Sequence, residues 1–344
     1  MPQESAHKIA SFELGRILAM LAIIVLHSQV ILTYALVDEV PWVGYIVNQL
    51  CRFAVPLFFL ISGYLIQPKL DSTPAFTFIR YSQPLVKIWL VWSVICLVMP
   101  FNLHVVATDG YLAERMGYWS WLMQAPLNTL MEGGLVHLWY IPGLLCALAL
   151  MTLCIHKHKV TLILPMALLL YVYGVLAGSY QELTQLWTPF FTRNGPFFSL
   201  LMVTLGYWVR KNQFSLSLNK ALVLSAFGLA VHFFEAYWLM GFDIAFNTHD
   251  FLFGTPLWAF GLFMALLAVP DFGRRIPNLF SASALILGVY VAHLPVVILM
   301  NNVAGMMELA NMEKDLLVVI GTITLTIPLV WAINKSKLRS LLLR

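Results

Sequence analysis

Residues 12–36 read FELGRILAMLAIIVLHSQVILTYAL, an apolar run with few polar positions. A helix crosses the hydrocarbon core of a bilayer in about 20 such residues, whereas the apolar core of a signal peptide has only roughly 7–15. This run is longer than a signal core and contains Arg16 and His27. We therefore predict a retained transmembrane helix and not a cleaved signal.

Apolar runs of this kind recur along the chain as far as Ile333, with no long polar stretch between them. Of the 344 residues, 60% are hydrophobic and 10% are charged, against roughly 25% charged in a soluble domain. A water-soluble fold would leave too much apolar surface exposed, so we predict one integral-membrane domain over residues 1–344. The runs are continuous and not alternating, which favours helices over a barrel.

The runs predict an all-α, polytopic membrane bundle of about ten transmembrane helices. The predicted helices cover residues 12–36, 42–66, 82–101, 137–155, 160–179, 196–209, 219–240, 251–270, 281–301 and 316–333.

Basic residues set the orientation, because cytoplasmic loops are enriched in Lys and Arg. We predict that both termini are cytoplasmic. The cytoplasmic side would then carry Lys8, Lys69, Arg80, Lys157, Lys159, Arg210, Lys211, Lys220, Arg274, Arg275, Lys335, Lys337, Arg339 and Arg344. The other side would carry only Arg115, Arg193 and Lys314. The longest outer connection, residues 102–136, contains Trp119 and Trp121 and suggests an interfacial helix.

The cysteines lie in or beside apolar runs and have no C-x-x-C spacing, which indicates packing and not chemistry. They are Cys51, Cys96, Cys146 and Cys154. We predict no metal site, no permanently bound cofactor and no nucleic-acid partner. The lipid bilayer is the partner that the composition requires.

Ionisable residues inside a membrane span are costly and commonly mark a functional cavity. Arg16 and His27 are eleven positions apart in the first predicted helix. Eleven steps of about 100° end some 20° past three full turns, so both side chains lie on one face, separated by a rise of roughly 16 Å. The alternative is a snorkelling Arg16 and a hydrogen-bonded core histidine.

Arg52 lies about 15 Å into the second predicted helix, near the middle of the bilayer. At that depth its guanidinium needs an anionic or carbonyl partner, from the protein or from a ligand. Ser62 and Tyr64 follow near the cytoplasmic end of the same helix. Pro56, which lies between Arg52 and Ser62, is expected to bend the helix, or simply to pack.

Further polar residues are weaker candidates. His137 and Tyr140 begin the fourth predicted helix and could equally belong to an aromatic belt at the interface. The others are each either functional or members of structural hydrogen-bonding pairs: Arg193, His232, Glu235 and His293.

Four of these segments together resemble the acyltransferase-3 family of membrane-bound O-acyltransferases. They are the Arg-x10-His spacing from Arg16 to His27, the F-F-x-x-S-G-Y segment ending at Tyr64, the H-L-W-Y segment from His137, and L-G-V-Y-V-A-H ending at His293. They occur in the expected order over nearly the whole chain. The resemblance implies a bacterial inner-membrane enzyme that moves an acyl group, commonly acetyl, from cytoplasmic acyl-CoA to a hydroxyl of an envelope glycan or lipid-linked sugar.

The resemblance implies that Arg16 and His27 are the family's signature pair, and for such an enzyme we predict the following roles. His27 would be the general base, with Arg16 as its signature partner, because histidine is the usual base near neutral pH. Arg52 would stabilise the thioester carbonyl or hold an acidic group of the acceptor. Acyl-CoA, in the first instance acetyl-CoA, would be a co-substrate held by Arg16, Ser62, Tyr64, Arg80 and Lys87. The acceptor would meet His137, Tyr140, Arg193, His232, Glu235 and His293.

Two features depart from the family pattern. Only Arg80 and Lys87 stand where relatives often carry a double-basic cluster, which puts the contacts to the CoA phosphates in question. Many relatives also carry a soluble domain after the helices, whereas here eleven residues follow the last predicted helix. We therefore expect the acceptor step to occur in the membrane domain or on another protein.

Two other functions fit the same intramembrane charges. A secondary transporter or flippase would use them along a polar path from one face to the other. A non-catalytic subunit of an envelope polysaccharide machine would use them for assembly. An acyltransferase predicts basic groups at the cytoplasmic mouth of a tunnel and a histidine at its far end. The sequence leaves open the acceptor, the acyl group, a direct or acyl-enzyme route, and the oligomeric state.

Overall fold

A computed structural model describes residues 9–343; Lys8 and Arg344, two of the predicted cytoplasmic residues, lie outside this range. The described residues form helices and no named strand, with one isolated bridge between Val37 and Val40. The elements are α1 (Ala10–Ser28), α2 (Trp42–Leu50), η1 (Cys51–Phe53), α3 (Ala54–Ser72), α4 (Pro74–Val98), α5 (Leu103–Asp109), α6 (Tyr111–Gln124), α7 (Pro126–Glu132), η2 (Val136–Trp139), α8 (Tyr140–His156), η3 (Val160–Leu162), α9 (Ile163–Leu176), α10 (Gln181–Thr184), α11 (Pro196–Lys211), α12 (Leu218–Met240), α13 (Gly254–Ala268), α14 (Leu279–Ser283), α15 (Ile286–Met306), α16 (Asn311–Lys335) and α17 (Arg339–Leu342).

Each of the ten predicted membrane segments is helical, which confirms a polytopic helical bundle. Seven helical segments are long and apolar enough to cross a membrane: Ala10–Ser28, Trp42–Ser72, Pro74–Val98, Val136–His156, Leu218–Met240, Ile286–Met306 and Asn311–Lys335. Three predicted segments form shorter helices, namely α9, α11 and α13. The bundle therefore contains both long and short helices, although hydropathy predicted a transmembrane helix for every segment.

The predicted end of the first helix is wrong. Helix α1 stops at Ser28 because Gln29 adopts a left-handed conformation, with φ of 50°, and its N–H donates to the carbonyl of Leu26. The second segment, in contrast, continues through η1 and α3 as far as Ser72. His27 consequently lies in the last turn of its helix and not in the middle of it.

The predicted outer helix between residues 102 and 136 is present as three short helices, α5, α6 and α7. Arg115 on α6 is fully buried and fastens them to α4. Its Nε is 2.5 Å from Glu114, and its guanidinium carbon lies 4.4 Å from the ring centre of Phe101. Its NH1 also faces the carbonyl of Cys96, at 3.4 Å.

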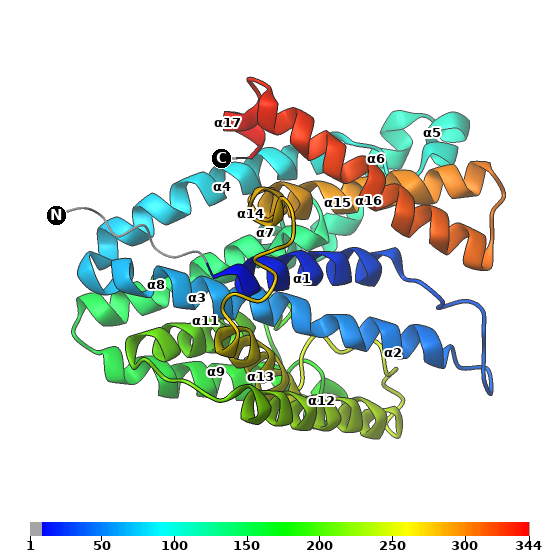
Figure 1. Cartoon of the computed structure of the whole chain (residues 1–344). Helices are drawn as coiled ribbons and strands as arrows, with labels where there is room; N and C mark the ends of the chain where they lie inside the picture. Colours follow the sequence, from blue (N-terminus) through cyan, green and yellow to red (C-terminus); the bar gives the residue numbers. More distant parts are fainter. Residues whose placement is uncertain (1–8, 344) are drawn as a thin grey trace.

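Figure 1 shows α1 and α3 in the middle of the molecule, with the α12 and α13 pair along one edge and α15 and α16 along the other. Helix α3 also packs closely on α11 at two glycines. A Cβ on Gly63 would be 2.0 Å from the carbonyl oxygen of Val203, and one on Gly206 would be 1.9 Å from that of Leu60. Only glycine permits so close a crossing, so α3 has a fixed position against α11.

One large apolar cluster joins the central helices. Cys154 packs against it, and Cys96 belongs to a second apolar cluster. All four cysteines are free, and Cys51 and Cys96 are buried. Helix α17 folds back onto α4, where the Lys87 amine donates to the Ser340 carbonyl and the Trp92 indole donates to the Leu342 carbonyl at 2.9 Å. The segment after α16 is therefore part of the same packed body.

Candidate functional site

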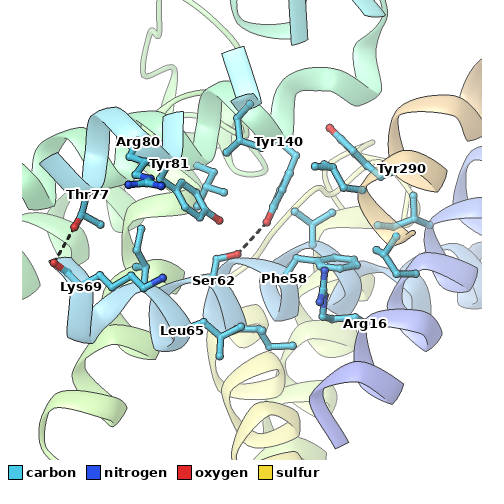
Figure 2. Close-up of a pocket in the computed structure, with 18 of the residues that line it drawn as sticks. Arg16, Phe58, Ser62, Leu65, Lys69, Thr77, Arg80, Tyr81, Tyr140 and Tyr290 are labelled. Atoms are coloured by element: carbon cyan, nitrogen blue, oxygen red, sulfur yellow. Dashed lines mark hydrogen bonds between the residues drawn. The ribbon is translucent and has the colours of Figure 1, made fainter. Parts of the chain in front are cut away.

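A cavity of about 790 Å³ lies between α1, α3, α4, α8 and α15, on the side predicted to be cytoplasmic (Figure 2). Five helices from both ends of the sequence contribute to its wall. The lining residues are Arg16, Ile23, Val55, Phe58, Ile61, Ser62, Leu65, Ile66, Lys69, Thr73, Phe76, Thr77, Arg80, Tyr81, Leu85, Tyr140, Leu144, Ile286, Leu287 and Tyr290. The wall is thus mostly apolar, with a few placed polar groups, as in small-molecule binding sites generally.

Three cations, and no carboxylate, belong to this lining: Arg16, Lys69 and Arg80. Arg16 pairs with Glu13 one turn before it, at 3.1 Å. Lys69 and Arg80 form no ion pair within the described residues 9–343. The cavity therefore has a net positive lining, which suits an anionic ligand.

Hydroxyl groups gather on the wall between these cations. Figure 2 shows the hydroxyls of Ser62, Tyr81 and Tyr140 pointing toward one another, with Arg16 and Arg80 on opposite sides. The oxygens of Ser62 and Tyr140 are 3.3 Å apart. Tyr140, which we expected in the acceptor site, therefore lines the same cavity as Arg16.

Ile23 on α1 and Tyr290 on α15 line the cavity, whereas His27 and His293 do not. His27 and His293 lie one helical turn beyond these residues and contact each other, with Nδ1 of His27 3.0 Å from Nε2 of His293. Nδ1 of His293 faces the carbonyl oxygen of Tyr290 at 2.5 Å. Arg16 and His27, which helical spacing places on one face of α1, thus connect the cavity with a histidine pair.

His137 brings a third imidazole to this point from η2. Its ring packs edge-on against that of His293, with the ring centres 5.2 Å apart. Nε2 of His137 donates to the carbonyl of Val291 at 3.1 Å, and the backbone carbonyl of His137 accepts from the Tyr290 hydroxyl. Its Nδ1 is buried without a hydrogen-bond partner in the described part of the chain. The site therefore unites three histidines that are distant in sequence.

Arg52 belongs to a second charged cluster. Its NH1 lies 2.6 Å from Asp250 and its NH2 lies 3.2 Å from the carbonyl of Asn247, both in the loop between α12 and α13. Arg193 binds the other oxygen of Asp250 at 2.9 Å and Glu132 at 2.7 Å. The anionic and carbonyl partners that a deep Arg52 requires are thus supplied by the protein itself.

The Asp250 carboxylate is the centre of this cluster. Burial alone would raise the pKa of Asp250, but Arg193 and Arg52 beside it outweigh burial and hold the pKa below its ordinary value. Asp250 therefore remains charged at neutral pH. The charges of Arg52, Arg193 and Asp250 also lie close enough to act on His27.

Two predicted CoA contacts lie elsewhere. The Tyr64 hydroxyl accepts from Arg210 at 2.9 Å, and its ring packs against Phe12, so it faces away from the cavity. The Lys87 amine is bound to the Ser340 carbonyl and does not line the cavity. The α3 and α4 helices place Ser62 and Arg80, respectively, on the cavity side instead.

Two predicted acceptor contacts have structural partners. His232 is fully buried, with Nδ1 2.9 Å from the Thr255 hydroxyl and Nε2 2.8 Å from the side-chain oxygen of Gln49. Glu235 accepts from the backbone N–H of Gly254 at 2.7 Å and from the hydroxyl of Tyr180. These bonds fasten α12 to its neighbours, so we no longer place His232 and Glu235 in the site.

Several residues of the cavity and of the Arg52 cluster were not predicted from the sequence. Lys69 follows the predicted end of the second helix, and Tyr81 precedes the predicted start of the third, so both lay outside the predicted membrane segments. Glu132 and Asp250 fell in predicted connections. The available signal was charge: each carboxylate borders a predicted helix, where an intramembrane arginine needs a counter-ion.

Comparison with known proteins gives a family and two relatives. A family model described as an acyltransferase domain matches residues 9–335. A serine/alanine racemase of Enterococcus gallinarum is 30% identical over 239 residues, which cover 63% of this chain and 32% of that protein. An amino-acid racemase of Enterococcus faecalis is 25% identical over 315 residues, 87% of this chain and 42% of that protein. The chain thus spans less than half the length of these relatives. No solved structure gives a significant match.

Proposed function

Because this chain belongs to the acyltransferase-3 family, we propose that it transfers an acyl group, in the first instance acetyl, from cytoplasmic acyl-CoA to a hydroxyl of an envelope glycan or lipid-linked sugar in the bacterial inner membrane. The observation that carries the proposal is a cavity that has three cations in its lining and reaches Ile23, one turn before His27.

The dimensions and charge of the cavity support acyl-CoA as the donor. Its volume of about 790 Å³ lies within the roughly 300–1,000 Å³ of ligand pockets. The phosphates would meet Lys69 and Arg80 on one side of the hydroxyl groups and Arg16 on the other, since Arg and Lys bind phosphate through charge-assisted hydrogen bonds. The pantetheine arm would extend along the apolar wall toward Ile23. From Ile23 to His27 the helix rises about 6 Å, a short step for the acyl end.

His27 is placed to act as general base. Its imidazole takes the proton of the acceptor hydroxyl while that oxygen bonds to the thioester carbonyl carbon, giving a tetrahedral oxyanion. Collapse of the oxyanion breaks the carbon–sulfur bond and expels the CoA thiolate. The thiolate then takes the proton back from His27, so that the products are the ester and free CoA. The base is unchanged at the end of the cycle.

Stabilisation of the oxyanion is assigned to the hydroxyl of Tyr140, with Ser62 as its hydrogen-bond partner. Arg52 is less suited to direct contact, because both of its terminal nitrogens already bind the loop between α12 and α13. We propose that Arg52 acts on the site through its charge and by holding that loop. Arg193 and His137 remain candidates for contact with the acceptor.

The rival function is transport of a polar substrate. A transporter needs polar groups along a path between the two faces, whereas the lining of this cavity includes Ile23 and none of the three histidines beyond it. The names of the two relatives concern amino acids. Serine, whose side chain is a hydroxyl, therefore belongs among the acceptors to be tested.

The test is a transfer assay with the purified full chain in lipid vesicles. Acetyl-CoA labelled in the acetyl group is supplied with envelope glycans, lipid-linked sugars or serine, and mild base is then used to release ester-linked label. We expect release that depends on both the protein and one acceptor class. If an acceptor enters the vesicles in the absence of acyl-CoA, and if no ester forms with any acceptor, the result would favour transport instead.

A further inference from the structure

The hydrogen bonds around His293 determine where its proton lies. Its Nδ1 is 2.5 Å from the carbonyl oxygen of Tyr290 on the preceding turn of α15. A carbonyl oxygen only accepts hydrogen bonds, so Nδ1 of His293 carries the proton. In the neutral ring the other nitrogen, Nε2, then holds a lone pair. His293 therefore presents an acceptor to whatever lies beyond it.

What lies beyond it is His27. Its Nδ1 is 3.0 Å from Nε2 of His293, and because that nitrogen accepts, Nδ1 of His27 has to donate. The neutral ring of His27 is then left with its lone pair on Nε2. The contact with His293 uses Nδ1 and thus leaves the basic nitrogen, Nε2, available. The His27 ring also hydrogen-bonds to the backbone of Ile23 on the preceding turn, and His27 is half-buried.

His293 is itself held firmly in place. It is fully buried, and the ring of His137 packs edge-on against it at 5.2 Å between centres. The His137 ring is fixed in turn by its bond to the carbonyl of Val291 on α15. Neither imidazole can turn over without breaking a buried hydrogen bond, and a buried polar group left without its partner is destabilising.

We propose that His293 is a positioning residue, which fixes His27 in the tautomer with its proton on Nδ1 and its lone pair on Nε2. The chain of groups is a carbonyl, an imidazole and a second imidazole, so the orienting partner is neutral. The part played in catalysis rests on the proposed function, since it assumes that Nε2 of His27 takes the acceptor's proton. The tautomer itself does not depend on any reaction.

The tautomer can be measured without an activity assay. The full chain is labelled with ¹⁵N in its histidine rings and studied in lipid bilayers by solid-state NMR, which separates protonated from unprotonated ring nitrogens. The difference between wild type and His27→Ala identifies the His27 signals. We expect a protonated Nδ1 and an unprotonated Nε2. A protonated Nε2 in the wild type would overturn the proposal, whatever the variants do.

Two variants then test whether His293 is the cause. His293→Gln keeps an acceptor oxygen near the position of Nε2, so the Nδ1–H tautomer of His27 should persist. His293→Leu removes the acceptor, and the His27 signals should shift toward the Nε2–H form. His104→Gln, an exposed position on α5, is the matched control for loss of one labelled ring. An unchanged tautomer in a folded His293→Leu protein would refute the role.

Kinetics provide a second readout, provided that the wild type transfers acyl groups. We expect kcat to fall on the order of 10²-fold in His293→Leu, less than the roughly 10⁴-fold caused by removing a charged orienting group from a Ser-His-Asp triad. The KM for acetyl-CoA should stay within about threefold, and His293→Gln should retain kcat within about tenfold. Equal losses in both variants would indicate a structural role. An inactive wild type with the expected tautomer would count against the proposed function alone.

Discussion

The cavity between α1, α3, α4, α8 and α15 and the Arg52 cluster use the same residue type in opposite ways. In the Arg52 cluster two arginines face two carboxylates, Asp250 and Glu132, and charge is balanced within the protein. In the cavity three cations line the wall, and one of them, Arg16, has a carboxylate partner, Glu13. The balanced cluster holds helices and a loop together, whereas the unbalanced cavity has positive charge left for a ligand.

This difference shows that an arginine in a membrane segment is not by itself a sign of substrate binding. Whether the arginine is available to a ligand depends on whether the protein supplies its counter-ion. Arg52 looked the more suggestive residue in the sequence because of its depth, but the α12–α13 loop neutralises it. Arg80, nearer the membrane surface, has no such partner in residues 9–343 and points into the cavity. His27 lies between the two regions, and its loss is expected to have the largest effect.

His27→Ala should have the largest effect. Removal of a general base is typically worth 10²-fold or more in rate, so acyl transfer should fall at least that far while membrane insertion is unchanged. Transfer would be measured with labelled acetyl-CoA, and His104→Ala would serve as the exposed control. Retention of more than about a tenth of the wild-type rate would remove His27 from the base role.

The double variant Arg16→Ala with Arg80→Ala should act on donor binding. Each charge-assisted hydrogen bond to phosphate contributes roughly 1.5–3 kcal/mol, and both groups are partly exposed, so the KM for acetyl-CoA should rise between about tenfold and 10²-fold. The kcat value should change little. Lys87→Ala is the matched control, because Lys87 binds the Ser340 carbonyl outside the cavity. A KM that responds to Lys87 and not to the pair would place the donor elsewhere.

Asp250→Asn should act on stability instead. It leaves Arg52 and Arg193 without their shared carboxylate, and breaking a buried pair costs about 3–5 kcal/mol. The Asp250 side chain is 32% exposed, so we expect less, about 1–3 kcal/mol, seen as a Tm lower by a few degrees. Arg52→Lys should lie between wild type and Arg52→Gln, because an ammonium cannot bind Asp250 and Asn247 in a fork. A Tm unchanged in every variant would mean that the cluster is not structural.

The smallest expected effect is on pH dependence. Since the pKa of Asp250 is held low by Arg193 and Arg52, its contribution to stability is present above the unfolded value near 4 and is lost as pH falls through the folded value. The Tm should therefore be flat between pH 8 and pH 5 on this account and should fall below about pH 4. In Asp250→Asn the fall should be smaller, and an identical acid limb would exclude Asp250 as its source.

Hydropathy predicted which segments are helical, but it could not predict where the first helix ends. Residues 29–36 are as apolar as those before them. The chain leaves the helix there, and Asp315 of α16 stabilises this course because its carboxylate accepts from the N–H of Ile31 at 2.7 Å and from the hydroxyl of Tyr34 at 2.8 Å. A side chain almost three hundred residues away therefore decides a local boundary.

The candidate site was predictable to a similar degree. Helical spacing placed Arg16 and His27 on one face, and the lining of the cavity by Arg16 and Ile23 follows that face. The pairing of His27 with His293 joins α1 to α15, and periodicity within one helix carries no information on such contacts. For the same reason the sequence could not distinguish His293, beside His27, from His232, whose partners are Gln49 and Thr255.

The attachment of α17 to α4 has a consequence for the order of synthesis. Helix α4 forms the wall that carries Arg80, yet the carbonyl that binds the Trp92 indole belongs to Leu342, 250 residues later in the chain. At about 5–20 residues per second, the ribosome needs roughly 12–50 s to make that stretch. During this interval α4 lies in the bilayer without its contact to α17. The wall that carries Arg80 thus gains this contact only after Leu342 has been made.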